Sequence, residues 1–244
     1  MRYPCPMLTR RSLALSALAL PLAGAARAQA PEPWRKADRL YTDDFTQGLA
    51  NWTIEAEQPA KVSAQNGVLE LDAPAGITAW FKPRLEGPVL IEYQALAVYE
   101  GGRNDRISDL NAFWMATDVR SPDDLFASPR TGAFAGYDLL KTYYVGQGGN
   151  YNSSTRLRRY VGRPGDRPML PQHDLKDARA LLQPNQWVHV QLVAYGDLVQ
   201  YWADGRKLFE MRDEDAYTAG WFGLRTTWSR LRFKDFSVWK LAAA

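Results

Sequence analysis

Side chains that bind polar ligands are concentrated in residues 143–160, a segment rich in Tyr, Asn and Arg. Two extended runs, residues 139–145 and 154–161, flank a Gly/Asn loop, which is typical of a β-hairpin. If Leu157 faces the core, the two-residue period of a strand places the opposite face at Arg156, Arg158 and Tyr160. A buried face would not carry two arginines. This face is therefore either a groove for an anionic or hydroxyl-rich ligand or a solvated surface with ordinary charges.

These residue types fit β-elimination on a uronate sugar. Arginine neutralises the sugar carboxylate through its planar fork, which makes the C5 proton acidic enough to remove. A tyrosine or histidine can take that proton, and a tyrosine can protonate the leaving oxygen. We assign the carboxylate clamp to Arg156 and Arg158 and the base and acid to Tyr144 and Tyr160. The predicted catalytic residues are Tyr144, Tyr160, Arg156, Arg158 and His173.

Further polar and aromatic residues are predicted to bind the substrate: Arg106, Asn111, Trp114, Asn150 and Asn152. Among them, Asn111 and Asn150 would donate hydrogen bonds to the developing oxyanion. Most aromatic side chains are expected in the core, and the candidates for a groove are Trp114, Trp202 and Trp228.

Two other functions stay open. A glycoside hydrolase needs a pair of carboxylates, which Asp105, Asp109 and Asp138 could supply. A non-catalytic glycan-binding module needs neither carboxylates nor a base. Because the chain has only two histidines and its one cysteine lies near the amino terminus, a zinc site is not expected. We predict no cofactor, although an oxygen-ligated calcium site is left open without a position.

Residues 1–28 have the features of an export signal. Paired arginines at Arg10 and Arg11 precede a short apolar stretch, residues 13–23, and Ala26-Arg27-Ala28 provides a small-residue cleavage site. The paired arginines favour the twin-arginine route over the Sec route. We therefore predict a bacterial periplasmic or secreted protein that is not attached to a membrane after the signal is removed.

The formal net charge of +3 belongs largely to this signal. Its four arginines, taken from 30 basic residues, leave 26 against 27 acidic residues in the mature chain. A chain so close to neutral gives no reason to expect nucleic-acid binding. The expected partner is a carbohydrate with acidic groups, bound by a monomer.

After a disordered leader predicted at residues 29–39, the chain alternates short β-forming runs with Gly, Pro and Asn turns. This pattern predicts one all-β domain at residues 40–242, a two-sheet antiparallel β-sandwich. Long polar or Pro-containing loops at residues 101–109, 121–135 and 161–185 are expected at one end of it.

The last third of the chain resembles the closing strands of concanavalin A-like lectin/glucanase domains. The resemblance rests on Asn-Gln-Trp-Val-His-Val at residues 185–190, Tyr-Trp-Ala-Asp-Gly at 201–205, Gly-x-x-Gly-x-Arg at 220–225 and Phe-x-Asp-Phe-x-Val at 233–238. It implies a concanavalin A-like jelly roll, a fold that hosts lectins, glycosidases and lyases. Glucanases of this superfamily carry Glu-x-Asp-x-x-Glu on a strand, and this sequence has no such motif.

The middle of the chain is similar to an uncharacterised family of secreted bacterial domains found among carbohydrate-degradation proteins. The similarity lies in Asn-Asp-Arg-x-Ser-Asp-Leu-Asn-x-Phe-Trp-Met at residues 104–115 and in the Tyr/Gly/Asn/Arg segment at residues 143–160. It implies a connection with carbohydrates but no particular reaction.

Overall fold

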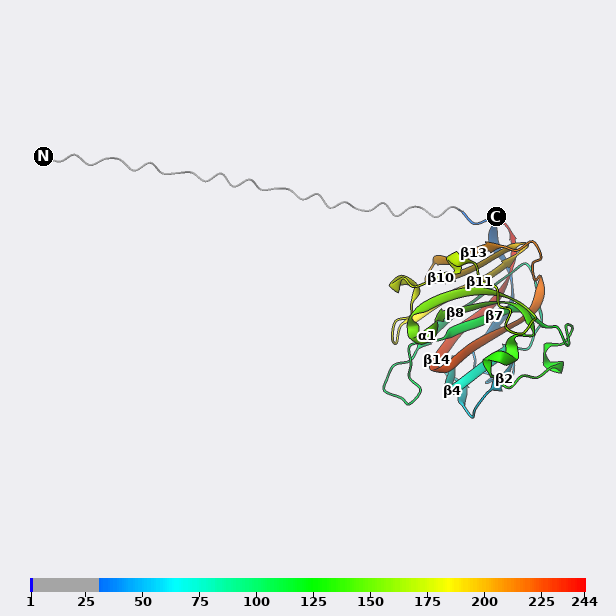
Figure 1. Cartoon of the computed structure of the whole chain (residues 1–244), viewed down its shortest axis with the longest axis horizontal. Helices are drawn as coiled ribbons and strands as arrows, with labels where there is room; N and C mark the ends of the chain where they lie inside the picture. Colours follow the sequence, from blue (N-terminus) through cyan, green and yellow to red (C-terminus); the bar gives the residue numbers. More distant parts are fainter. Residues whose placement is uncertain (2–30) are drawn as a thin grey trace. The chain divides into compact units, whose positions relative to one another are not determined.

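The computed structural model describes residue 1 and residues 31–244, and residues 33–244 form one compact unit. The other residues of the predicted export segment lie outside the described part. Antiparallel strands make up most of the unit (Figure 1). The strands are β1 (Trp34–Asp43), β2 (Trp52–Ala56), β3 (Lys61–Gln65), β4 (Val68–Phe81), β5 (Leu85–Glu86), β6 (Val89–Ala97), β7 (Leu110–Asp118), β8 (Leu140–Gly148), β9 (Ser154–Val161), β10 (Asp174–Leu175), β11 (Trp187–Tyr195), β12 (Leu198–Ala203), β13 (Arg206–Arg212) and β14 (Ala219–Ala243).

Helical structure is limited to single turns between the strands. They are η1 (Leu125–Ala127), η2 (Phe134–Tyr137), α1 (Gly149–Asn152), η3 (Pro171–His173) and η4 (Ala178–Ala180). Among the described residues, none of these helices has the length and apolar character needed to span a bilayer.

Two long strands, β4 and β14, run through both layers of the sandwich. The first layer has the order β10-β9-β8-β7-β14-β4-β2. In this layer, residues 221–225 of β14 pair with β7, and residues 77–81 of β4 pair with β2. The second layer has the order β13-β12-β11-β6-β14, where β14 pairs through residues 231–240. A register shift between Thr227 and Ser229 separates the two halves of β14. In Figure 1 the labels β8, β7, β14, β4 and β2 follow one another across the first layer.

Aromatic side chains bridge the two layers in the core. Tyr93 of β6 packs against Phe222 of β14, with ring centroids 5.8 Å apart. The hydroxyl of Tyr201 on β12 donates to Gln147 on β8 at 2.6 Å. Alternate positions of each strand point into this core, as the sandwich pattern requires. The predicted all-β, two-sheet antiparallel fold is confirmed.

The segment predicted as a disordered leader contains the start of a strand. β1 begins at Trp34 and pairs with the end of β14, from Trp34 opposite Ala243 to Asp43 opposite Phe236. The prediction was wrong for residues 34–39 because the alternation there is weak and most of these side chains are exposed. Specific side-chain contacts hold the strand, since the Trp34 indole donates to Gln200 at 3.1 Å and Lys36 contacts Glu92 at 2.7 Å.

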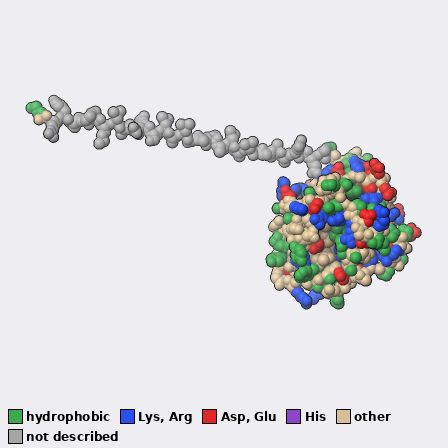
Figure 2. All heavy atoms as spheres, in the orientation of Figure 1, with side chains coloured by type: hydrophobic (Ala, Val, Ile, Leu, Met, Phe, Trp, Pro, Cys, Tyr) green, Lys and Arg blue, Asp and Glu red, His purple; other side chains and the backbone are tan. Residues whose placement is uncertain are grey.

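Glu92 links four strands on the outer face of the second layer. Its carboxylate accepts hydrogen bonds from Lys36 of β1, Trp239 of β14 and Gln191 of β11, and His189 lies 3.5 Å away. Burial opposes ionisation of this carboxyl group, but the hydrogen bonds from His189, Lys36 and Trp239 outweigh it and lower the pKa of Glu92 to about 2. On the face of the molecule shown in Figure 2, acidic and basic side chains are interspersed.

The lowered pKa of Glu92 makes the stability of the fold depend on pH. The folded pKa of about 2 lies below the ordinary value of 4.5, so the stabilisation is present above pH 4.5 and is lost as the pH falls towards 2. We expect Glu92→Gln to lower the Tm at neutral pH, and the difference from wild type to shrink over that acidic window. Thermal unfolding across pH measures this, with Glu86→Gln at an exposed surface pair as the control. A difference that stays constant with pH would contradict the assignment.

Candidate ligand-binding site

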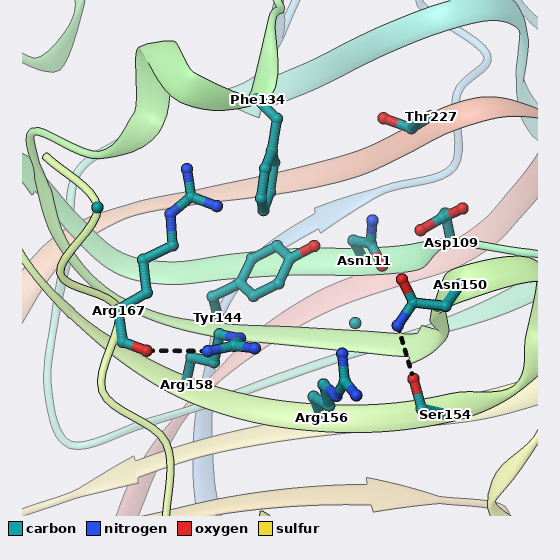
Figure 3. Close-up of a pocket in the computed structure, with 13 residues that line it drawn as sticks. Asp109, Asn111, Phe134, Tyr144, Asn150, Ser154, Arg156, Arg158, Arg167 and Thr227 are labelled. Atoms are coloured by element: carbon teal, nitrogen blue, oxygen red, sulfur yellow. Dashed lines mark hydrogen bonds between the residues drawn. The ribbon is translucent and has the colours of Figure 1, made fainter. Parts of the chain in front are cut away.

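A cavity of approximately 620 Å³ opens on the outer face of the first layer (Figure 3). Strands β7, β8 and β9 form its floor, and its walls come from the connections that precede β7, join β7 to β8 and follow β9. The three long loops predicted at one end of the sandwich therefore meet here. The lining residues are Asp109, Asn111, Phe134, Tyr144, Gly146, Gly149, Asn150, Ser154, Arg156, Arg158, Gly165, Arg167 and Thr227.

The predicted alternation along β9 is confirmed. Leu157 is fully buried in the core between the layers. Arg156 and Arg158 line the cavity on the opposite face. Tyr160 shares that face but lies below the cavity, with its ring 5.3 Å from the ring of Tyr144. The strand thus presents two guanidinium groups and a phenol on the face that carries the cavity.

The cavity is lined by more positive than negative charge. Arg156 is paired with Asp174 at 2.9 Å, and Arg167 is paired with Asp138. Arg158 donates to the backbone oxygen of Arg167 at 3.0 Å, and the described residues place no carboxylate within ion-pair distance of it. Arg158 is thus the guanidinium best placed to bind an anion that enters the cavity.

A fourth guanidinium, that of Arg225, lies fully buried in β14, opposite Asn111 of β7. Its Nη1 donates to Thr78 Oγ1 at 3.0 Å and to the Gly132 carbonyl oxygen at 2.9 Å, while its Nε and Nη2 have no partner among the described residues. The ring of Tyr137 lies 4.6 Å from its Cζ. A buried charge without a carboxylate partner costs several kcal/mol of stability, which makes Arg225 a positive charge that an anionic ligand would compensate.

Gly146 opens the floor of the cavity. A Cβ at this position of β8 would lie 3.0 Å from Asn111 Oδ1 and 3.4 Å from the Tyr144 hydroxyl. Glycine therefore avoids placing a side chain against these two polar atoms. Asn111 Oδ1 and the buried Tyr160 hydroxyl have no hydrogen-bond partner among the described residues. Figure 3 shows the Tyr144 hydroxyl directed towards Asn111.

Burial controls the protonation of the titratable groups around the cavity. It raises the pKa of Tyr144 well above its usual range, with a further contribution from the neighbouring Tyr160. Burial also raises the pKa of Tyr160, to about 12. The pKa of Asp109 is raised by burial against the opposing hydrogen bonds from Ser108 and Asn111. Both phenols are therefore protonated at neutral pH, and they fit the role of acid better than that of base.

A buried ion-pair network holds the β7–β8 connection against the first layer. Arg130 donates to both carboxylate oxygens of Glu55, at 2.8 and 3.1 Å, and to Asp118 at 3.1 Å. Trp80 and Tyr137 each donate to Glu55 at 2.9 Å. Both partners of the central pair are almost fully buried. This network fixes the segment that carries Phe134 over the cavity.

Trp114 and His173 lie away from the cavity. Trp114 is fully buried in the core between the layers, with its ring 5.5 Å from Tyr143, so it cannot bind substrate. Because side chains alternate along β7, Trp114 lies on the opposite face of the strand from Asn111 and Phe113. His173 is buried on the other side of β9, where its ring packs against Phe209 and its Nε2 contacts the Glu210 carbonyl oxygen at 3.3 Å. Burial lowers the pKa of His173, and the residue does not line the cavity.

The other predicted binding residues differ in their placement. Asn111 and Asn150 line the cavity. Asn152 instead exchanges two hydrogen bonds, both 2.9 Å long, with the backbone of Leu182, and so fixes the loop behind α1. Arg106 lies outside the lining and stacks between two aromatic rings, those of Tyr151 and Trp228.

The carboxylates proposed for a hydrolase are not gathered in the cavity. Among the described lining residues, Asp109 alone carries a carboxylate. Asp105 accepts from the backbone of Glu100 and Gly102 at 2.6 and 2.9 Å, and Asp138 is occupied by Arg167 and the Gly165 amide. A glycosidase of the usual kind needs two carboxylates facing each other across the scissile bond. The described lining does not supply that pair.

The outward-facing positions of β7 also lack the carboxylates that a glycosidase of the usual kind needs. A bulge near Met115, whose φ is 53°, gives the strand three positions on the outer face, namely Asn111, Phe113 and Ala116. Their spacing equals that of the Glu-x-Asp-x-x-Glu signature of superfamily glucanases. None of the three is a carboxylic acid.

The lining residues that were not predicted from the sequence include Phe134, Ser154, Arg167 and Thr227. The buried Arg225 beneath them left a signal, because an arginine directly follows the apolar run at residues 221–224. Within the described part of the chain, no three His, Cys, Asp or Glu residues are grouped so that they could hold a metal ion.

The chain belongs to the family described as "Domain of unknown function (DUF6250)", whose model matches residues 71–236. No curated protein sequence matches this chain. A solved structure from Bacillus subtilis, a protein of unknown function with a galectin-like fold, superposes with a TM-score of 0.68 at 15% identity, covering 86% of this chain and all of that one.

Two further solved structures share the fold. The carbohydrate-binding module CBM66 of Bacillus subtilis has a TM-score of 0.54 at 12% identity, covering 78% of this chain and 96% of its own. The β-agarase B of Zobellia galactanivorans has a TM-score of 0.55 at 9% identity, covering 89% and 97%. The predicted concanavalin A-like sandwich is thereby confirmed at the level of the fold.

The network around Arg130 yields a prediction about stability. Arg130→Ala leaves Glu55 and Asp118 buried without their shared partner, which should lower the free energy of unfolding by about 3–5 kcal/mol. Denaturant unfolding measures this. The control is Arg120→Ala, which removes a half-exposed partner of the same Asp118 and should cost about 1 kcal/mol or less. Equal losses in the two variants would show that the Glu55–Arg130 pair does not anchor the connection.

Proposed function

We propose that this member of the DUF6250 family is a carbohydrate-active protein that binds an acidic glycan, holding a sugar carboxylate against the arginines of the cavity. The observation that carries the proposal is Arg158, a guanidinium in the cavity that has no carboxylate partner in the described part of the chain. Arg156, Arg167 and the buried Arg225 add positive charge around it, and the described lining contains one carboxylate, that of Asp109. A planar guanidinium meets a carboxylate through two parallel hydrogen bonds.

Other features of the cavity favour a sugar over a simple inorganic anion. Its volume of approximately 620 Å³ suits a small organic ligand. Asn111, Asn150 and Ser154 offer hydrogen-bonding groups for sugar hydroxyls, and Phe134 offers an aromatic surface. Solved structures of the same fold include one named as a carbohydrate-binding module and one named as an agarase. These names support a carbohydrate ligand by analogy of fold.

Arg158 provides the test of this proposal. Arg158→Ala should weaken binding of a uronate oligosaccharide about 10-fold to 100-fold, because a charge-assisted hydrogen bond contributes about 1.5–3 kcal/mol. Arg158→Lys keeps the charge but loses the fork, and should recover only part of the affinity. Isothermal titration calorimetry measures both variants. The control is Arg163→Ala at an exposed pair outside the lining. Uronate binding that is unchanged in Arg158→Ala would refute the proposal.

A second candidate function, β-elimination, is favoured by the two phenols beside the guanidinium groups. In this reaction the arginines neutralise the carboxylate, a base removes the C5 proton, the C4–C5 double bond forms and the C4–O4 bond breaks. Because Tyr144 is protonated at neutral pH, it fits as the acid that protonates the leaving oxygen. Asp109, a lining carboxyl group with a raised pKa, fits as the base in place of a tyrosine.

The β-elimination proposal has a direct test. The mature protein is mixed with a panel of uronate glycans, and the ultraviolet absorbance of a conjugated unsaturated uronate is followed. Tyr144→Phe and Asp109→Asn should each lower the rate about 100-fold or more while leaving glycan binding within a few fold. The control is Tyr99→Phe at an exposed tyrosine outside the cavity. Binding without any rise in absorbance in the wild-type protein would leave the glycan-binding function alone.

The cellular location and oligomeric state remain predictions of the sequence. We propose export of the folded protein by residues 1–28 to the periplasm or the exterior, where glycans are accessible. We also propose that it acts as a monomer.

A further inference from the structure

Two exposed aromatic side chains lie next to the cavity without any role in it. The side chain of Tyr151 in α1 is 73% exposed, and that of Trp228 in β14 is 46% exposed. Large aromatic side chains are normally buried in a sandwich of this size, because their burial contributes strongly to stability. Their exposure therefore has no explanation in the packing of the fold.

The guanidinium of Arg106 holds the two rings in place. Its Cζ lies 3.8 Å from the ring centroid of Tyr151 and 4.4 Å from that of Trp228. Each cation–π contact contributes about 0.5–1 kcal/mol at an exposed site. Because Arg106 covers one side of each ring, the exposed remainder of each ring is open to a ligand. We call these three residues the aromatic clamp.

Both aromatic residues have strained backbones. The φ angle is 61° at Tyr151 and 45° at Trp228, in the left-handed region that bulky side chains rarely adopt. Such strain costs about 1–3 kcal/mol per residue and is retained where the surrounding structure gives the residue a function. Glycine would occupy either position without that cost. The structure thus keeps an aromatic ring at two positions where the backbone alone would favour a smaller residue.

The clamp is continuous with one wall of the cavity. Asn150 and Thr227, the residues immediately before Tyr151 and Trp228, both line the cavity, as does Asp109, three residues after Arg106. Figure 3 shows Asp109, Asn150 and Thr227 together on one side of it. A chain-like ligand that leaves the cavity on this side would meet the two rings.

We propose that the aromatic clamp is a second sugar subsite, where a neighbouring residue of the bound glycan stacks on Tyr151 or Trp228. The proposal rests on the proposed function, because the first sugar is held by the arginines of the cavity. The apolar face of a pyranose ring packs well on an aromatic ring, and this contact requires no charge on the sugar. The site therefore selects an oligosaccharide or polysaccharide over a single acidic sugar.

The test compares a monosaccharide uronate with oligosaccharides of increasing length by titration calorimetry. For the wild-type protein, affinity should rise about 10-fold or more between the monosaccharide and a tetrasaccharide. Tyr151→Ala and Trp228→Ala should remove most of this gain and leave binding of the monosaccharide unchanged. The control is Tyr99→Ala, which removes an exposed tyrosine that is not part of the clamp. Equal affinities for short and long ligands in the wild-type protein would overturn the proposal.

Trp228→Gly separates a binding role from a structural role. Glycine accepts a positive φ, so this variant should keep or raise the Tm while losing the gain from chain length. A clear fall in Tm, with the gain retained, would show that the ring serves stability instead. The proposed function and this inference can fail separately. If the wild-type protein binds no uronate of any length, the proposed function of the cavity is refuted. If uronates bind with an affinity that depends on Arg158 but not on chain length, only the proposal for the clamp is refuted.

Discussion

The buried ion pair between Glu55 and Arg130 is the interaction on which the site depends. It ties the β7–β8 connection to β2, and it is completed by Asp118 and by donors from Trp80 and Tyr137. Desolvating two charges is costly, so such a pair is weak as a source of net stability. Breaking it is nevertheless expensive, because the remaining charge stays buried. The pair therefore specifies one position for the connection, and that position turns an open sheet face into a cavity.

The charge around the cavity then decides which chemistry fits. Two lining arginines are partly neutralised, by Asp174 and Asp138, while Arg158 and the buried Arg225 have no carboxylate partner among the residues that the structure describes. A hydrolytic site of this fold would show the reverse balance, with at least two carboxylates and little positive charge. The balance favours an anionic ligand, and the protonated phenols of Tyr144 and Tyr160 add hydrogen-bond donors in a region of low dielectric constant.

The sequence predicted the architecture well, because alternation and turn residues are local signals. Along β9 the positions of Arg156, Leu157 and Arg158 followed from a period of two. The period also applies to Trp114, but the sequence does not state which face of β7 is inward, and Trp114 proved to be the inward residue. His173 was assigned to the site because it is close in sequence to the hairpin at residues 143–160. In the structure, β9 separates it from the cavity.

Residues supplied by distant segments were the hardest to predict. Arg167 and Phe134 reach the cavity from long connections whose paths depend on buried pairs formed with other elements. Arg225 lies in the Gly-x-x-Gly-x-Arg motif at residues 220–225. That motif predicted a closing strand of the fold, but it gave no indication of a ligand. The first part of β1, residues 34–39, was missed because its contacts, such as Lys36 with Glu92, join residues 56 positions apart in the chain.

The central claim is that the cavity recognises a carboxylate on a sugar, and changing the ligand tests it most directly. Calorimetric titration of the mature protein with a uronate oligosaccharide is compared with the same oligosaccharide after its carboxyl groups are reduced to alcohols. The account predicts that the native ligand binds and that reduction removes most of the affinity, with the native affinity falling as salt concentration rises. Equal affinity for the two ligands would contradict the account, because the arginines would then contribute nothing to recognition.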